Sequence, residues 1–325
     1  MVSPTFNREH ALARLKALEP VFRHSPLLRL GADGLFAKLE YNLYSGSAKD
    51  RPAYRIMLDA LNAGKLDSGP QIIESSSGNF AIALASLARI IGLEFIPVID
   101  PNISPGKERM LKALTQRQIK VCERDATGGF LLNRIKAVNQ FVLEHPGTFN
   151  PNQYTNEGNY MSYRDTLAEE LITALPRLDY VFICVSSGGT ITGVSIRLKQ
   201  VFPRVKIIAI DVEGSAIFAD RPKVRFLSGI GSSIKPPLLK RALIDEIILL
   251  PEADVVQGCQ LLLRDEGVLA GPSSGATYWA ARRVYQEQCQ SPAISVLLFP
   301  DRGDTYLDTV YNPDWVSEHY SLPVR

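Results

Sequence analysis

Lys49 lies in a stretch, Tyr41 to Ala53 (YNLYSGSAKDRPA), whose residue types could support amine chemistry. Ser47 is a good N-cap and Pro52 is tolerated only in a first helical turn, so we expect a helix to begin near Ser47. Lys49 would then lie beside the positive end of the helix dipole, where burial and a positive field favour a neutral amine. Such lysines act as nucleophiles and form Schiff bases with carbonyl groups. Taken alone, the Lys-Asp-Arg triplet fits a solvated first turn better.

The first of three polar loops comprises Ser75, Ser76, Ser77, Gly78 and Asn79. It follows a predicted strand and precedes a predicted helix, which is where ligands bind in open parallel sheets. Its hydroxyls and free backbone N–H groups suit a carboxylate, and the Asn79 amide could hold a ligand hydroxyl or phenolate oxygen. A simple helix cap explains the loop equally well.

The second loop comprises Ser186, Ser187, Gly188, Gly189 and Thr190, between an apolar strand and a helix. Paired glycines let the backbone approach a phosphate, and the hydroxyls complete the donor set. The loop lacks the lysine of a Walker motif and the spacing of a dinucleotide motif, so the phosphate of a small cofactor fits best. A plain strand-to-helix turn is the alternative.

The third loop, Ala270 to Gly275, also precedes a helix. Its Ser273 hydroxyl could face a ring nitrogen, although a helix cap is the better explanation of this loop by itself.

The elements that carry these loops alternate between strands and amphipathic helices, which predicts parallel sheets covered on both faces. The predicted strands cover residues 27–30, 35–39, 71–74, 94–99, 119–122, 180–185, 205–212, 244–250 and 294–299. The predicted helices cover residues 8–18, about 47–63, the stretch after Asn79 up to 91, 105–114, 128–144, 160–174, 191–201, 253–266 and 275–288. Turn residues at Gly31 to Gly34 predict a hairpin, and breaks between Pro146 and Pro151 suggest two sheets. The expected class is therefore a two-domain α/β protein.

Composition excludes several other functions. The chain has 325 residues and a formal charge of +2, and no dense basic block suggests a nucleic-acid surface. Its four cysteines and four histidines are scattered and match no metal spacing, so we expect no metal site. No signal peptide or membrane-length apolar stretch is evident, and we expect a soluble cytoplasmic protein with no membrane partner.

A lysine at a helix start, a Ser/Asn loop, a glycine-rich phosphate loop and a late serine occur in the order found in one enzyme family. The chain resembles the fold-type II pyridoxal-phosphate enzymes of the cysteine synthase and cystathionine β-synthase group. The resemblance implies that Lys49 binds the cofactor as a Schiff base and Asn79 contacts its 3′-oxygen. It also implies that Ser186 to Thr190 hold the cofactor phosphate, Ser273 faces the pyridine nitrogen, and Ser75 to Gly78 bind the substrate carboxylate.

The resemblance further implies two domains of the tryptophan synthase β-like type and a homodimer. Residues 44–150 would form a smaller, mobile domain that closes over the substrate. Residues 1–43 and 151–325 would form the larger domain.

Three segments resemble one branch of that family, the N-(2-amino-2-carboxyethyl)-L-glutamate synthases: Asp125 to Arg134, Asn152 to Tyr154, and Phe299 to Leu307. Members of the branch join O-phospho-L-serine to the amine of L-glutamate, release phosphate, and serve 2,3-diaminopropionate formation in siderophore and antibiotic pathways. The resemblance implies that Arg134 and Tyr154 help to bind glutamate. Arginine offers a bidentate fork for a carboxylate, whereas sulfide needs none. An exposed helical Arg134 and a core Tyr154 are the alternatives.

Arg225 is the candidate to bind the phosphate of the leaving group, with Arg221 and Lys223 nearby, because it precedes the loop from Ser228 to Gly231. A solvated surface loop is an equally good explanation. The phosphate loop is also close to the cysteine-synthase form. A cysteine synthase that uses O-acetylserine or O-phosphoserine is therefore the alternative enzyme. A binding or regulatory protein that has lost the chemistry is the alternative of another class, although the retained Lys49 argues against it.

Overall fold

The computed structural model describes residues 6–31, 34–67, 69, 71–219, 223–288 and 293–321. The chain divides into two compact units. Unit 1 comprises Met1–Arg23, Leu43–Ser45 and Lys49–Asn159, and unit 2 comprises His24–Asn42, Gly46–Ala48 and Tyr160–Arg325. The chain thus passes from unit 2 to unit 1 between Ala48 and Lys49. Mobility of residues 44–150 stays a prediction.

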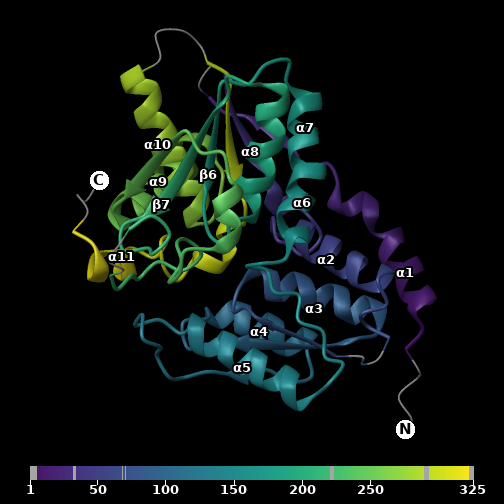
Figure 1. Ribbon diagram of the computed structural model, residues 1–325. Coiled ribbons are helices and arrows are strands. Elements are labelled where there is room, and N and C mark those ends of the chain that lie inside the picture. Colours follow the sequence, from purple (N-terminus) through teal and green to yellow (C-terminus); the bar gives the residue numbers. More distant parts are fainter. Residues whose placement is uncertain are drawn as a thin grey trace. The chain divides into compact units, whose positions relative to one another are not determined.

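Unit 1 contains a three-stranded parallel sheet in the order β3-β4-β5. The strands are β3 (Gln71–Ser75), β4 (Glu94–Ile99) and β5 (Ile119–Lys120). The helices are α1 (Arg8–Ala17), α2 (Asp50–Asn62), α3 (Asn79–Ile91), α4 (Pro105–Leu114) and α5 (Leu131–Glu144), with a 3₁₀ turn η1 at Glu19–Phe22 (Figure 1). Successive strand residues point to opposite faces, so Ile72 packs with α1, α2 and α3, while Ile73 packs with α5.

Unit 2 contains a six-stranded sheet in the order β1-β2-β9-β6-β7-β8. Its strands are β1 (Leu27–Arg29), β2 (Leu35–Leu39), β6 (Tyr180–Cys184), β7 (Lys206–Val212), β8 (Glu246–Leu250) and β9 (Ser295–Phe299). Only the pairing of β1 with β2 is antiparallel among the described strands.

Helices cover both faces of this sheet, as Figure 1 shows for α8, α9 and α10. They are α7 (Leu167–Ala174), α8 (Gly189–Val201), α9 (Glu252–Glu266), α10 (Pro272–Gln288) and α11 (Pro313–His319). Helix α6 (Glu157–Asp165) begins in unit 1 and continues into unit 2, and 3₁₀ turns η2, η3 and η4 lie at Glu40–Asn42, Pro237–Arg241 and Gly303–Tyr306. Phe182 packs with α9 and α10, and its neighbours in β6 pack with α7 and α8. The α/β class with parallel-dominated sheets is confirmed.

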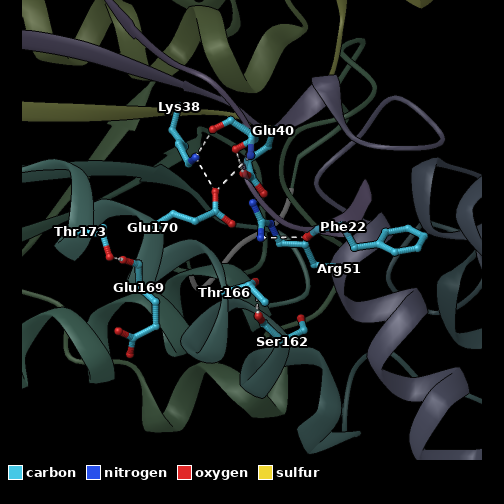
Figure 2. A network of polar contacts seen from close by, with 10 residues as sticks. Phe22, Lys38, Glu40, Arg51, Ser162, Thr166, Glu169, Glu170 and Thr173 are labelled. Atoms are coloured by element: carbon cyan, nitrogen blue, oxygen red, sulfur yellow. Dashed lines mark hydrogen bonds and ion pairs between the residues drawn. The ribbon is translucent and has the colours of Figure 1, made fainter. Parts of the chain in front are cut away.

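A buried polar network in unit 2 links β2 to α7 (Figure 2). Lys38 Nζ lies 2.6 Å from Glu170 Oε2, and the two side chains are 3% and 8% exposed. Glu170 Oε2 also accepts a hydrogen bond from the backbone N–H of Ser25, 3.1 Å away. The Ser25 hydroxyl donates to Glu40 Oε1 at 2.5 Å, and Lys38 donates to the Ser25 carbonyl oxygen. Charged groups this deeply buried are stable only when paired.

Several element boundaries differ from the sequence expectations. The helix expected from residue 128 begins at Leu131, because Gly128 is left-handed (φ 78) and Asp125 Oδ2 accepts the Leu132 N–H at 2.8 Å. The helix expected over residues 160–174 is broken at Thr166 (φ −128, ψ −77) into α6 and α7. The predicted Ser47 cap was wrong, since α2 has Lys49 at its N-cap and Ser47 forms a bridge with Asp301. The tip of the expected hairpin, residues 32–33, lies outside the described residues.

Candidate active site

Hydrogen bonds formed by the two neighbouring residues fix the backbone position of Lys49. Its own carbonyl oxygen accepts the Ala53 N–H at 3.1 Å, which starts α2. Before it, Ala48 donates its N–H to Pro300 at 2.8 Å and accepts the Tyr163 hydroxyl at 2.9 Å. After it, the buried Asp50 carboxylate accepts the N–H and hydroxyl of Ser45 at 2.7 and 2.5 Å. The amine therefore extends, half-buried, from a fixed backbone position.

The Ser75 to Asn79 loop uses its hydroxyls in different ways. Ser76 Oγ accepts the N–H groups of Gly78 and Ala81, at 3.4 and 3.2 Å, so this side chain caps α3 as the cap interpretation predicts. The buried Ser75 hydroxyl has no hydrogen-bond partner among the described residues. A Cβ added to Gly78 would meet nothing within 4 Å, so there is open space beside the loop. Carboxylate binding by this loop stays a prediction.

Arg134 lies against that same loop in unit 1. Its Nη1 donates to Ser77 Oγ at 2.7 Å, and its Nε lies 3.2 Å from Asp100 Oδ2. The Arg134 side chain is only 11% exposed, so the alternative of an exposed helical residue does not hold. Tyr154 lies within electrostatic range: burial raises the pKa of Tyr154 to about 12, and the positive charge of Arg134 opposes that rise. The structure therefore brings Ser77 and Arg134 into contact, with Tyr154 in electrostatic range of Arg134.

Sequence reasoning missed Glu74, the last residue before the loop. Its side chain is buried, and burial raises the pKa of Glu74 to about 8. Hydrogen bonds from the backbone N–H groups of Asn152 and Gln153 lower the pKa, but burial has the larger effect. Glu74 is therefore mostly neutral at pH 7, and its Oε2 has no hydrogen-bond partner among the described residues. The only signal in the sequence was an acidic residue directly after the apolar pair Ile72 and Ile73 in a predicted strand.

The raised pKa of Glu74 predicts a pH dependence of stability. Between an unfolded value of 4.5 and a folded value of about 8, the folded chain binds more protons than the unfolded one. Glu74 therefore stabilises the fold fully below about pH 4.5, and its contribution is lost as the pH rises towards 8. We expect Glu74→Gln, which cannot ionise, to show a shallower loss of Tm from pH 5 to 8 than the unsubstituted protein. Parallel profiles of the two proteins would contradict this assignment.

The Ser186 to Thr190 loop in unit 2 forms the start of α8. Gly188 is left-handed (φ 83), and a Cβ there would lie 3.1 Å from the backbone nitrogen of Leu239. Ser187 and Gly189 are buried, Thr190 is half-buried and Ser186 is exposed. The first N–H groups of a helix have no acceptor within it and carry partial positive charge. These residues therefore fit a phosphate dianion, although binding itself stays a prediction.

Ser273 and Arg225 also lie in unit 2, each bonded to the loop from Gly229 to Gly231. The Ser273 hydroxyl donates to the Gly229 carbonyl oxygen at 2.8 Å. Arg225 Nη1 donates to the Ile230 carbonyl oxygen at 2.6 Å, and burial lowers the pKa of Arg225. Arg225 is thus half-buried rather than solvated. Its proposed contact with a leaving phosphate stays a prediction, and Arg221 lies outside the described residues.

Asp211, at the end of β7, is a second acidic residue that sequence reasoning did not select. It is fully buried, and burial raises the pKa of Asp211 to about 6, while Ser215 and Arg225 oppose the rise. Its position gives Arg225 a counter-charge within unit 2.

The described part of the chain holds neither a candidate metal cluster nor a membrane-spanning helix. No group of three or more His, Cys, Asp or Glu side chains there could hold a metal ion. No described helix is long and apolar enough to cross a membrane.

Residues 18–301 match the family model of the pyridoxal-phosphate dependent enzymes. The chain belongs to this family. Pyridoxal phosphate is its cofactor, and the half-buried amine of Lys49 and the N-terminus of α8 are chemically suited to the cofactor's aldehyde and phosphate.

Relatives within the family include the N-(2-amino-2-carboxyethyl)-L-glutamate synthase of Ralstonia nicotianae. It is 41% identical over 300 residues, which cover 90% of this chain and 88% of the relative. Among solved structures, the O-acetylserine dependent cystathionine β-synthase of Helicobacter pylori is 27% identical, with a TM-score of 0.83, and the match covers 91% of this chain and 98% of that one. An O-ureido-L-serine synthase is 25% identical, with a TM-score of 0.82 and coverage of 94% and 96%. These proteins confirm the expected fold type and family.

Proposed function

We propose that this enzyme is a transferase that joins O-phospho-L-serine to the amine of L-glutamate. The bond between the β-carbon and the phosphate oxygen breaks, a bond from the glutamate nitrogen to the β-carbon forms, and phosphate leaves. The glutamate amine loses a proton in the exchange. The product is N-(2-amino-2-carboxyethyl)-L-glutamate, a precursor of 2,3-diaminopropionate in siderophore or antibiotic formation, and we expect a cytoplasmic homodimer.

The buried guanidinium of Arg134 beside Ser77 is the observation that carries this proposal. Glutamate brings two carboxylates, and an arginine held in one geometry can bind one of them through two parallel hydrogen bonds. Sulfide has no group that would use such a residue. The 41% identity to a synthase of this name supports the same choice of second substrate.

The chain's own residues have distinct roles in the proposal. Bound pyridoxal phosphate withdraws electrons from the substrate α-carbon, which allows loss of the α-proton and of a β-leaving group. Lys49 binds the cofactor and then removes that α-proton. Ser75 to Gly78 orient the first substrate's carboxylate, Asn79 contacts the cofactor's 3′-oxygen, and Ser186 to Thr190 hold its phosphate. Ser273 offers a neutral hydroxyl to the ring nitrogen and so does not enforce its protonation. Arg225 contacts the leaving phosphate.

The direct test is to incubate the purified protein with O-phospho-L-serine and either glutamate or sulfide, and to identify products by mass spectrometry. A glutamate adduct formed efficiently supports the proposal. Efficient formation of cysteine without a glutamate adduct would identify a cysteine synthase instead. A protein that stays colourless with added pyridoxal phosphate would favour a binding or regulatory role.

Substitution of Arg134 tests the assignment of the glutamate site. We expect Arg134→Ala to raise the KM for glutamate by roughly tenfold to a hundredfold, because a charge-assisted bidentate contact is lost. Single-turnover release of phosphate from O-phospho-L-serine, measured without glutamate, should change by less than about threefold. Equal losses in both measurements would show that Arg134 has another role.

A further inference from the structure

Three side chains of unit 1, from three different elements, form a closed polar triangle. Ser77 comes from the loop after β3, Asp100 follows β4, and Arg134 lies in the first turn of α5. The Ser77 hydroxyl donates to Asp100 Oδ2 at 2.8 Å and accepts from Arg134 Nη1 at 2.7 Å. The third side is the 3.2 Å contact between Arg134 Nε and Asp100 Oδ2. Each member of the triangle therefore contacts the other two.

Asp100 is also held by a backbone hydrogen bond from outside the triangle. Its Oδ1 accepts the backbone N–H of Asn102 at 2.8 Å, so the turn after β4 sets the direction of the carboxylate. The side chain is 8% exposed, which limits its freedom further. Arginine has a long, flexible side chain, and its planar guanidinium is useful in recognition only when its orientation is set. Asp100 supplies that orientation directly and through Ser77.

The hydrogen-bond donors of Ser77 and Arg134 explain why the triangle suits a substrate carboxylate in addition to the carboxylate of Asp100. A hydroxyl has one proton, and that of Ser77 is directed to Asp100. A guanidinium has five N–H donors. In the described part of the chain only the Nη1 group of Arg134 forms a side-chain hydrogen bond, and the buried Nε–H has no hydrogen-bond partner. Arg134 thus keeps donors for an incoming anion while its position is held.

We propose that Asp100 is a positioning residue that orients Arg134 and thereby selects a carboxylate-bearing amine over sulfide as the second substrate. This inference rests on the proposed function of the enzyme. Asp100 also carries a negative charge, which by itself repels an anionic substrate. If repulsion dominated, removal of the charge would tighten glutamate binding, and if positioning dominates, removal weakens it. The sign of the change in KM therefore decides between the two effects.

The experiment compares Asp100→Asn with the unsubstituted holoenzyme, since asparagine keeps the size and one acceptor oxygen for Ser77. We expect the KM for glutamate to rise about tenfold, as for loss of one charge-assisted contact. The rate with sulfide, and single-turnover phosphate release from O-phospho-L-serine, should stay within about twofold. Asp100→Glu, which restores the charge on a longer side chain, should recover part of the glutamate affinity.

Glu94→Gln is the matched control. Glu94 begins β4, at the opposite end from Asp100, and its Oε1 lies 3.0 Å from Arg117 Nε. This variant also loses an arginine–carboxylate pair, but its KM for glutamate should not change.

Three results for Asp100→Asn would overturn the assignment: a lowered KM for glutamate, an unchanged KM, or equal losses with glutamate and sulfide. If the unsubstituted enzyme forms no glutamate adduct, the proposed function fails and this inference fails with it. An adduct formed equally well by both proteins refutes only the positioning role.

Discussion

Replacing Lys49 with alanine is expected to lower product formation by about a thousandfold or more and to abolish covalent attachment of the cofactor. General acid–base groups alone contribute about a hundredfold to ten-thousandfold to rates, and Lys49 has the additional role of binding the cofactor in our proposal. The substitution should have little indirect effect on the backbone around position 49. The backbone on both sides of Lys49 is held by the hydrogen bonds of Ala48 with Pro300 and Tyr163 and by those that Asp50 accepts from Ser45, and these bonds do not involve the lysine amine.

The covalent link can be measured without turnover. Treatment with borohydride reduces an imine to a stable amine, and peptide mass spectrometry then shows which lysine carries the cofactor. We expect the added mass on the peptide with Lys49 in the unsubstituted protein and on no peptide in Lys49→Ala. Lys112→Ala, an exposed lysine of α4, serves as control and should keep both colour and activity. A variant lacking Lys49 that retains the covalent chromophore and turnover would refute the proposed mechanism.

Replacing Lys38 with methionine is expected to destabilise unit 2 by about 3 kcal/mol. Methionine fills a similar volume, so the main change is loss of the positive charge 2.6 Å from Glu170 in the buried network of Figure 2. The Glu170 carboxylate is 8% exposed, and the substitution removes its cationic partner while the hydrogen bond from the neutral Ser25 N–H remains. A loss of this size lowers Tm by roughly 6–12 °C.

Thermal unfolding of matched variants checks the effect. Lys112→Met removes a lysine from an exposed pair with Glu108, 3.1 Å away, and should leave Tm unchanged within error. The double variant Lys38→Met with Glu170→Gln should be more stable than Lys38→Met alone, because the side chain at position 170 then carries no charge beside the methionine. A single variant as stable as the unsubstituted protein would show that the ion pair contributes nothing net.

Sequence alone identified the fold class, because local hydrophobic periodicity indicates the alternation of strands and helices. The bounds of β4 and α4 were predicted to the residue: Ser104 caps α4 and Pro105 begins it. The family also followed from sequence, since its motifs are short and each lies within one loop. Lys49, the serine loop and the phosphate loop all belong to this class of local signal.

Tertiary structure decided what the polar side chains of the site contact. Ser77 lies 57 residues from Arg134 and 23 residues from Asp100, so no local pattern could reveal their triangle. The raised pKa of Glu74 likewise results from burial in the folded chain, which outweighs the opposing backbone N–H groups of residues 152 and 153. Periodicity reports which face of an element is apolar, whereas a hydrogen bond or a shifted pKa depends on groups that only the folded chain brings together. For that reason the sequence determined the cofactor and the order of the motifs, and the folded chain determined which of their side chains remain available to a substrate.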